Sequence, residues 1–276
     1  MSVELAFERL DGAAPERAIA FLHGILGRGQ NLKTIARRFI EARPSWTAWL
    51  IDLRGHGRSP KSTPGPSLEA AARDVLGLAS GIRTPLCAIA GHSFGGKVAL
   101  EMARLGGIET LEHVVPIDSS PGRRTPNDAA GPLEIIKTIE ALPPTFSSRS
   151  AFVDSLVKAG QPRSIAQWLA QSLDQAGNDV RFALDLSEIR ALISDYLGRD
   201  LWPVVKSPPG IVCIHLIIAD RSDSYPPADR EQAERIAKTS ERVTVDVLPG
   251  GHWIHVDNPD GLLRTLLERI PLSGPS

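Results

Sequence analysis

A net charge of one sign is nearly absent from this sequence of 276 residues. Its 31 basic and 32 acidic side chains leave a formal charge of -1 at pH 7. Because the two kinds of charge nearly cancel, the protein has no overall electrostatic field that would attract phosphate backbones or anionic lipid. Nucleic acid is therefore not expected among the partners of this protein.

Long hydrophobic runs are absent as well. The longest ones, such as Ile211 to Ala219, are far shorter than the roughly 20 residues that a membrane helix needs. The first ten residues carry Glu4, Glu8 and Arg9 among apolar side chains, without the basic stretch leading into an apolar one that marks a signal peptide. We therefore expect a cytoplasmic protein with no integral membrane segment.

Cysteine is scarce, because the sequence holds only Cys87 and Cys213. Each lies inside an apolar run that we interpret as a buried strand, where a free cysteine behaves as a small hydrophobic residue. We expect two core thiols rather than a disulfide, in line with the cysteine usage of intracellular chains.

Short apolar runs bounded by glycine, proline or aspartate alternate with stretches of helical period. This alternation indicates βαβ units around a parallel sheet. Apolar residues between Leu32 and Ile40 recur at helical spacing, which predicts a crossover helix with Asn31 as its N-cap. Seven runs are predicted to be strands: Val3–Leu10, Ala18–Leu22, Ala48–Ile51, Leu86–Ala90, His113–Ile117, Ile211–Ile218 and Val243–Leu248.

The alternation stops after Ile117 and resumes only at Ile211. A structureless loop of that length is uncommon inside a compact domain, so we expect a helical insertion. The fold predicted is an α/β fold with a mostly parallel central sheet flanked by helices. Residues 1–120 and 207–276 would form this core, and residues 121–206 a helical lid inserted in it. Helical patterns within the insertion are Leu133–Leu142, Ala151–Ala159, Ile165–Leu173 and Glu188–Leu197.

The strongest local motif is G-H-S-F-G-G at residues 91–96, directly after a predicted strand and before a helical pattern. In a nucleophile elbow the serine lies on a strained strand-to-helix turn, and the neighbouring glycines avoid collisions there. The motif predicts Ser93 as a nucleophile and the amide of Phe94 as a donor to the oxyanion formed after attack. The alternative is a tight turn that merely contains a serine.

A second motif, H-G-I-L-G at residues 23–27, follows the strand Ala18–Leu22. An acyl-transfer site needs two amides that converge on the oxyanion, and a glycine-rich turn after a neighbouring strand can present one. Together with the elbow, this motif predicts the backbone of Ile25 as the second donor. Alone, His23 and Gly24 could simply close a turn.

A third motif, G-G-H-W-I-H at residues 250–255, follows the last predicted strand and precedes a helix from about Pro259. A serine hydroxyl is a weak nucleophile until an imidazole takes its proton, and a histidine on a loop at the carboxyl edge of the sheet can do so. We predict His252 as this base, with His255 as the competitor. The remaining histidines outside the second motif are interpreted as turn or core residues: His56, His92, His113 and His215.

The order of these motifs along the chain resembles that of the α/β-hydrolase superfamily. The stretch D-L-R-G-H-G-R-S at residues 52–59 resembles the superfamily's turn after the third strand, in which Asp52 and Arg54 would be structural. More narrowly, residues 23–27 and 91–99 resemble a branch of small esterases and thioesterases that act on acyl esters of modest length. The resemblance implies a Ser-His-Asp triad and neither a metal ion nor an organic cofactor.

The position of the triad acid departs from the commonest pattern of the superfamily. Most of these enzymes carry it after the strand that is here Ile211–Ile218, where this chain reads A-D-R-S-D and Ser222 takes the usual place. The other site used in such enzymes is the end of the preceding strand, which is here Asp118. We predict Asp118 as the acid, with Asp223 as the alternative and Asp220 behind both.

These predictions together indicate a serine hydrolase that cleaves a carboxylic ester or thioester through an acyl-enzyme. Serine rather than aspartate at position 93 argues against dehalogenase and epoxide hydrolase chemistry. Hydrolysis of a C–C bond and perhydrolysis stay open on the same triad, as does a binding protein without catalysis. Six aromatic residues of the insertion either line an acyl pocket or pack it onto the core: Phe146, Phe152, Trp168, Phe182, Tyr196 and Trp202.

Overall fold

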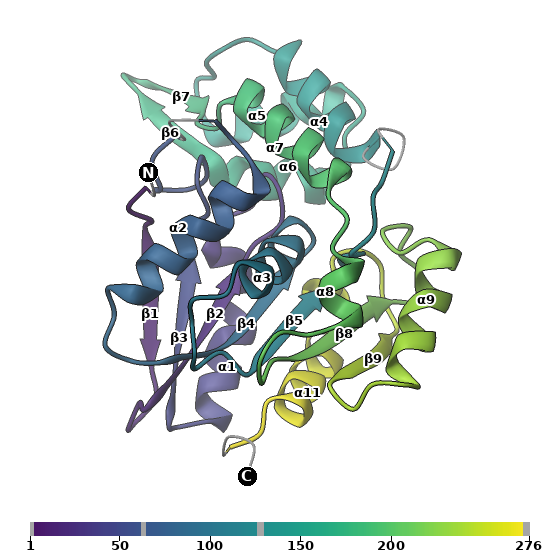
Figure 1. Ribbon diagram of the computed structural model, residues 1–276. Helices are drawn as coiled ribbons and strands as arrows, with labels where there is room; N and C mark the ends of the chain where they lie inside the picture. The colour runs from purple at the N-terminus through teal and green to yellow at the C-terminus, as the bar shows by residue number, and fades with distance from the viewer. Residues whose placement is uncertain (1–2, 62–64, 126–129, 273–276) are drawn as a thin grey trace.

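The computed structural model describes residues 3–61, 65–125 and 130–272. Within them, a seven-stranded sheet forms the centre of the molecule, in the order β1-β3-β2-β4-β5-β8-β9 (Figure 1). Only β1 of these strands runs antiparallel to its neighbour. The strands are β1 (Phe7–Asp11), β2 (Arg17–Leu22), β3 (Trp46–Ile51), β4 (Leu86–His92), β5 (His113–Ile117), β8 (Cys213–Ala219) and β9 (Val243–Leu248).

Each of the seven predicted strands is present in this mostly parallel sheet. The largest difference is at the first strand, which begins at Phe7 instead of Val3. Every residue of β3, β4 and β5 is buried, because helices cover both faces of the sheet. This double burial explains why these strands read as continuous apolar runs.

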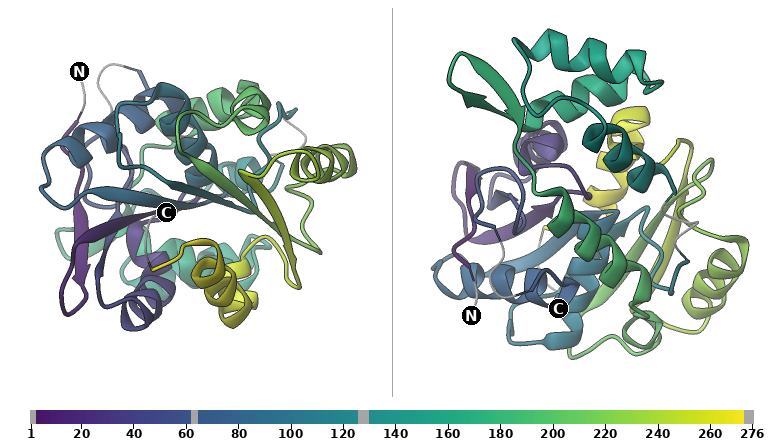
Figure 2. Two further views of the ribbon diagram at one scale, coloured as in Figure 1. Left: turned by 60° about the horizontal axis from the view of Figure 1, so that its bottom comes forward. Right: turned by 90° about the horizontal axis from the view of Figure 1, so that it is seen from above.

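Helices pack on the two faces of the sheet and enclose two separate apolar cores (Figure 2). One face carries the helices α2 (Leu68–Ser80), α3 (Phe94–Leu105), α8 (Trp202–Lys206) and α9 (Pro227–Ala237). The opposite face carries α1 (Lys33–Ala42) and α11 (Pro259–Arg269), with the short α10 (Ile254–Asp257) before it. None of the helices in the described ranges is long and apolar enough to cross a membrane.

The predicted N-cap of the crossover helix is wrong. Helix α1 begins at Lys33, its N-cap position is Leu32, and no side chain caps it. Asn31 lies instead in a short 3-10 turn, η1 (Gly29–Leu32), and its Oδ1 accepts a hydrogen bond from the amide of Arg28 at 2.7 Å. The asparagine thus closes a turn before the helix, a use that competes with capping.

Between β5 and α8 the chain forms a group of elements that lies beyond one end of the sheet (Figure 1). The four predicted helical segments correspond to α4 (Ala130–Glu140), α5 (Arg149–Lys158), α6 (Arg163–Leu169) and α7 (Leu186–Gly198). The segment also contains a hairpin that was not predicted, β6 (Leu173–Ala176) and β7 (Asp179–Phe182). The prediction of helix up to Leu173 was therefore wrong, since α6 ends at Leu169 and a 3-10 turn, η3 (Ala170–Ser172), leads into the hairpin.

A buried lysine ties both ends of this inserted segment to helix α3. The Nζ atom of Lys97 donates hydrogen bonds to the carbonyls of Gly122, Tyr196 and Arg199, at 2.7, 2.8 and 3.0 Å. Burial, and then the charge of Arg124, lowers the pKa of Lys97 to about 7. The three carbonyls replace the water that the amine would otherwise bind.

Candidate active site

Ser93 lies at the sharp turn between β4 and α3. Its φ is 52° and its ψ is -116°, a conformation that costs a residue with a side chain on the order of 1–3 kcal/mol. A Cβ atom on Gly91 would lie 2.1 Å from the carbonyl oxygen of Gly95, and one on Gly95 would lie 2.4 Å from that of Leu22. Glycine is therefore required on both sides of the serine.

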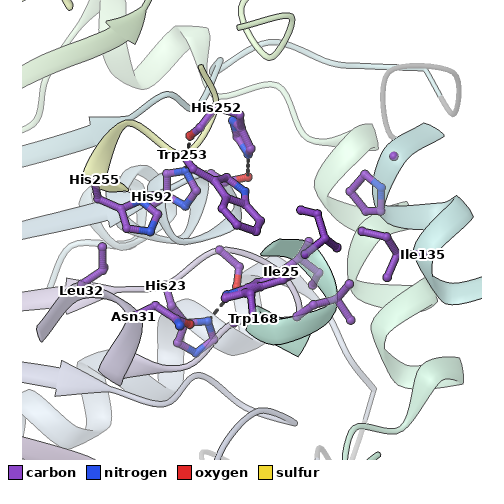
Figure 3. Close-up of a pocket in the computed structure, with 17 residues that line it drawn as sticks. His23, Ile25, Asn31, Leu32, His92, Ile135, Trp168, His252, Trp253 and His255 are labelled. Carbon is purple, nitrogen blue, oxygen red and sulfur yellow. Dashed lines mark hydrogen bonds between the residues drawn. The ribbon is translucent and has the colours of Figure 1, made fainter. Parts of the chain in front are cut away.

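Ser93, His252 and Asp118 form an unbroken line of hydrogen bonds. The Oγ of Ser93 lies 3.0 Å from Nε2 of His252, and Nδ1 of the same ring lies 2.6 Å from Oδ2 of Asp118 (Figure 3 shows His252). A carboxylate only accepts, so Nδ1 carries the proton and Nε2 is free to accept from the serine hydroxyl. This arrangement can move a proton from Ser93 to the imidazole.

The carboxyl group of Asp118 is fully buried directly after β5, in a backbone conformation with φ of 45°. Besides the imidazole, it accepts hydrogen bonds from the amide of Ala219 at 3.1 Å and from Oγ of Ser222 at 2.5 Å. The sequence analysis identified position 222 as the usual place of the acid in similar enzymes. In this chain Ser222 occupies that place, and its hydroxyl donates a hydrogen bond to Asp118. The hydroxyl of Ser224 also lies 2.8 Å from Nδ1 of His252.

The other predicted candidates lie outside this line. Asp223 is exposed, and its backbone carbonyl accepts a hydrogen bond from Arg124 at 3.0 Å. Asp220 accepts from the amide of Gly250 at 2.8 Å. The ring of His255 packs against another imidazole instead of bonding to Ser93. In the described part of the chain, neither of these two aspartates bonds to His252.

The backbone amides of the two predicted oxyanion donors, Phe94 and Ile25, lie on segments next to Ser93. Phe94 is the first residue of α3, and the first amides of a helix have no partner within it. Ile25 lies on the loop after β2, whose next residue, Leu26, has a φ of 64°. Across residues 3–61, 65–125 and 130–272, neither the Ile25 amide nor the Phe94 amide donates a backbone hydrogen bond.

Two buried histidines shape the loop that carries Ile25. Nε2 of His23 accepts from the amide of Leu53 at 2.9 Å, and Nε2 of His56 accepts from the amide of Leu26 at 3.2 Å. Burial lowers the pKa of both imidazoles, which keeps the lone pairs that these bonds need. His56 is thus a core residue, as predicted, while the part played by the His23 side chain had no signal in the sequence.

A cavity of about 170 Å³ opens beside Ser93 (Figure 3). Of the six aromatic residues considered in the sequence, Trp168 lines it, and its ring lies 5.0 Å from that of Trp253. Phe146 and Phe182 instead pack against Phe152 inside the inserted segment. The cavity is lined mainly by apolar side chains, among them Ile25, Leu26, Leu32, Pro132, Ile135, Ile165, Trp168 and Trp253.

His92 is a residue of the site that the sequence analysis assigned to turn or core. It lines the same cavity, and its Nε2 donates to the backbone carbonyl of His252 at 2.7 Å (Figure 3). Burial lowers its pKa well below the ordinary value. Its place directly before Ser93 was the one signal that could have marked it.

The parallel sheet covered on both faces, with serine, histidine and aspartate at the carboxyl ends of its strands, defines an α/β hydrolase. Residues 19–265 match the model described as "Alpha/beta hydrolase family", so this chain belongs to that family. The fold predicted from the sequence is thereby confirmed.

Named relatives agree with this membership. A mouse protein described as "sn-1-specific diacylglycerol lipase ABHD11" is 28% identical over 263 residues, which cover 94% of this chain and 82% of that protein. A "Putative esterase/lipase" of Haemophilus influenzae is 27% identical over 250 residues, covering 90% of this chain and 81% of its own. The solved structure "Marine microorganism esterase" has a TM-score of 0.82 at 24% identity, covering 98% of this chain and all of its own, which shows the shared fold. These relatives support carboxylic ester hydrolysis, the class of reaction predicted from the sequence.

Proposed function

We propose that the protein hydrolyses small carboxylic esters or thioesters with Ser93 as nucleophile, His252 as base and Asp118 as acid. The observation that carries this proposal is the line of hydrogen bonds, 3.0 Å from Ser93 to His252 and 2.6 Å from His252 to Asp118. The strained turn holds Oγ at the end of a strand, and the buried carboxylate fixes the tautomer of the ring.

The reaction follows from these positions. Oγ of Ser93 attacks the acyl carbon while Nε2 of His252 takes its proton, and the amides of Ile25 and Phe94 stabilise the oxyanion of the tetrahedral intermediate. The imidazolium then protonates the leaving alcohol or thiol, and the acyl group stays on the serine. A water molecule, deprotonated by His252, attacks this acyl-enzyme and releases the carboxylic acid together with the free serine.

The cavity favours substrates of modest size. Its volume of about 170 Å³ and its mainly apolar lining suit an acyl group. The motifs at residues 23–27 and 91–96, which resemble those of small esterases and thioesterases, support the same choice. We therefore propose that the protein belongs to that branch, and we expect short acyl groups to react best.

We further propose that residues 121–206 act as a lid over this cavity. Three contacts support this role. The rings of Trp168 and Trp253 meet, Nδ2 of Asn31 donates to Oε1 of Gln171 at 3.0 Å, and the guanidinium of Arg28 donates to the carbonyl of Gln171 at 2.5 Å.

A cytoplasmic location stays a prediction, with which the two free thiols agree.

Substitution of the nucleophile tests the proposal. Ser93→Ala should lower turnover of p-nitrophenyl esters and acyl-CoA thioesters by at least about three orders of magnitude, because the covalent route is lost. The matched control is Ser80→Ala, since this exposed serine on α2 is remote from the cavity. A fluorophosphonate probe should label the wild type and the control but not Ser93→Ala. A folded Ser93→Ala variant that kept more than about a tenth of the activity would overturn the assignment.

A further inference from the structure

His92 connects the nucleophile turn to the loop that carries the proposed base. It is the last residue of β4, directly before Ser93, and only 5% of it is exposed. Its Nε2 lies 2.7 Å from the carbonyl oxygen of His252 (Figure 3). A carbonyl can only accept, so the proton of His92 is on Nε2 and the lone pair on Nδ1.

The loop around His252 needs such a connection. Gly250 and Gly251 precede the histidine, and glycine, which has no Cβ, restricts the backbone less than other residues do. Asp220 and Asp257 accept from the amides of these two glycines, at 2.8 and 2.7 Å. Those bonds fix the approach to His252, whereas the bond from His92 holds the peptide group of His252 itself.

The ring of His92 also lies against the imidazole of the base. Its centroid is 4.7 Å from that of His252 and 4.8 Å from that of His255. Burial is the largest cause of its lowered pKa, followed by His252, His255 and His23, while the nearby carboxylates bond to other groups, Asp118 to His252 and Asp257 to the Gly251 amide. A neutral His92 adds no positive charge beside the imidazolium that forms on His252 during attack.

We propose that His92 is a positioning residue for His252. Through its hydrogen bond to the His252 carbonyl, it keeps Nε2 of the base within reach of Ser93 and Nδ1 against Asp118. This inference rests on the proposed function, because it assigns His92 to the same reaction. Small misplacements of a reacting group lower the rate by large factors. A hydrogen bond that holds the backbone of His252 therefore matters for turnover.

Two near-isosteric variants separate the hydrogen bond from the bulk of the side chain. His92→Met removes the donor, and His92→Gln keeps an N–H at the place of Nε2. We expect kcat/KM for p-nitrophenyl acetate to fall about 10- to 100-fold in His92→Met and to recover to within about fivefold of wild type in His92→Gln. The acid limb of the kcat/KM profile, which reports the free base, should move to lower pH in His92→Met, because the imidazolium is held less firmly against Asp118. In His92→Gln the acid limb should return to its position in the wild type.

The control is His113→Met, which removes a buried neutral imidazole from β5, outside the cavity. It should lower the melting temperature and leave the pH profile where it is in the wild type. Equal activity of His92→Met and wild type, or a His92→Gln variant no better than His92→Met, would overturn the positioning role. In either case an inactive Ser93→Ala would leave the proposed function standing, whereas an active one would overturn both.

Discussion

The carboxyl group of Asp118 is buried among donors from three other residues, His252, Ser222 and Ala219. An amide in its place keeps the shape but loses the charge that stabilises the imidazolium. Asp118→Asn should therefore lower turnover by roughly three to four orders of magnitude, measured with p-nitrophenyl esters.

Asp223→Asn is the matched control, because this exposed carboxylate also follows a strand of the same sheet edge. We expect it to change turnover by less than about tenfold, or 1.4 kcal/mol in the barrier. The reverse ranking would move the triad to Asp223. Melting temperatures complete the comparison, since an unstable Asp118→Asn variant that retains activity in proportion to its folded fraction would show a structural role alone.

Single residues of the site differ in how well the sequence could predict them. Ser93 and His252 each stand in a contiguous motif with its own glycines, so a local pattern was enough to single them out. Ser222 and His92 act on triad residues across neighbouring strands or loops. Such contacts depend on the order and register of β4, β5 and β8, which no local pattern contains.

At the scale of elements, helix α6 carries the residue that should decide which acyl chains fit. Trp168 lines the cavity from this helix, while Lys97 holds both ends of the inserted segment to α3. Trp168→Ala should enlarge the cavity and leave the contacts of Lys97 with the inserted segment in place. We expect the preferred chain length to rise, with longer p-nitrophenyl esters gaining at least about fivefold in kcat/KM relative to the acetate, equivalent to roughly 1 kcal/mol.

Phe182→Leu is the control for this change, because Phe182 packs against Phe152 within the inserted segment and does not line the cavity. It should leave the ratio of long to short esters near that of the wild type. A Trp168→Ala variant that lowered turnover of every ester by the same factor would show that the lid does not select among substrates.

The elements that the sequence predicted share one physical property. Strands β2 to β5 and β8 are buried on both faces and therefore form apolar runs that stand out from their surroundings. In the hairpin of β6 and β7 no residue is fully buried, and each strand is only four residues long. The two strands are joined by a turn at Gly177, with a φ of 66°. The alternation of Val180 and Phe182 with polar residues in β7 is too short to stand out in the sequence.

For the whole molecule, buried neutral imidazoles predict a loss of stability in acid. Burial, then His113 and Arg269, lowers the pKa of His215 to about 3, and burial also lowers the pKa of His113, which lies 3.1 Å away. The folded form thus binds these protons less readily than the unfolded chain, whose histidines titrate near 6.5. The contribution of His215 to stability is complete above that value and declines as the pH falls toward 3, by on the order of 1 kcal/mol per pH unit.

Urea unfolding at several pH values between 7.5 and 4.5 measures this decline. His215→Gln, which cannot take up a proton, should flatten the curve of unfolding free energy against pH by about one proton. An equal slope in wild type and variant would show that His215 does not titrate on unfolding. The other buried imidazoles, such as His23 and His56, act in the same direction and keep a residual slope.

The distance along the chain between Ser93 and His252 has a consequence for the making of the protein. The two residues are 159 positions apart, and His252 lies on the loop between β9 and α10. At about 5–20 residues per second, a ribosome adds His252 roughly 8 to 30 seconds after Ser93. Throughout that interval the nascent serine lacks its proposed base, His252. If Ser93 and His252 act together as proposed, hydrolysis requires a chain translated at least as far as His252.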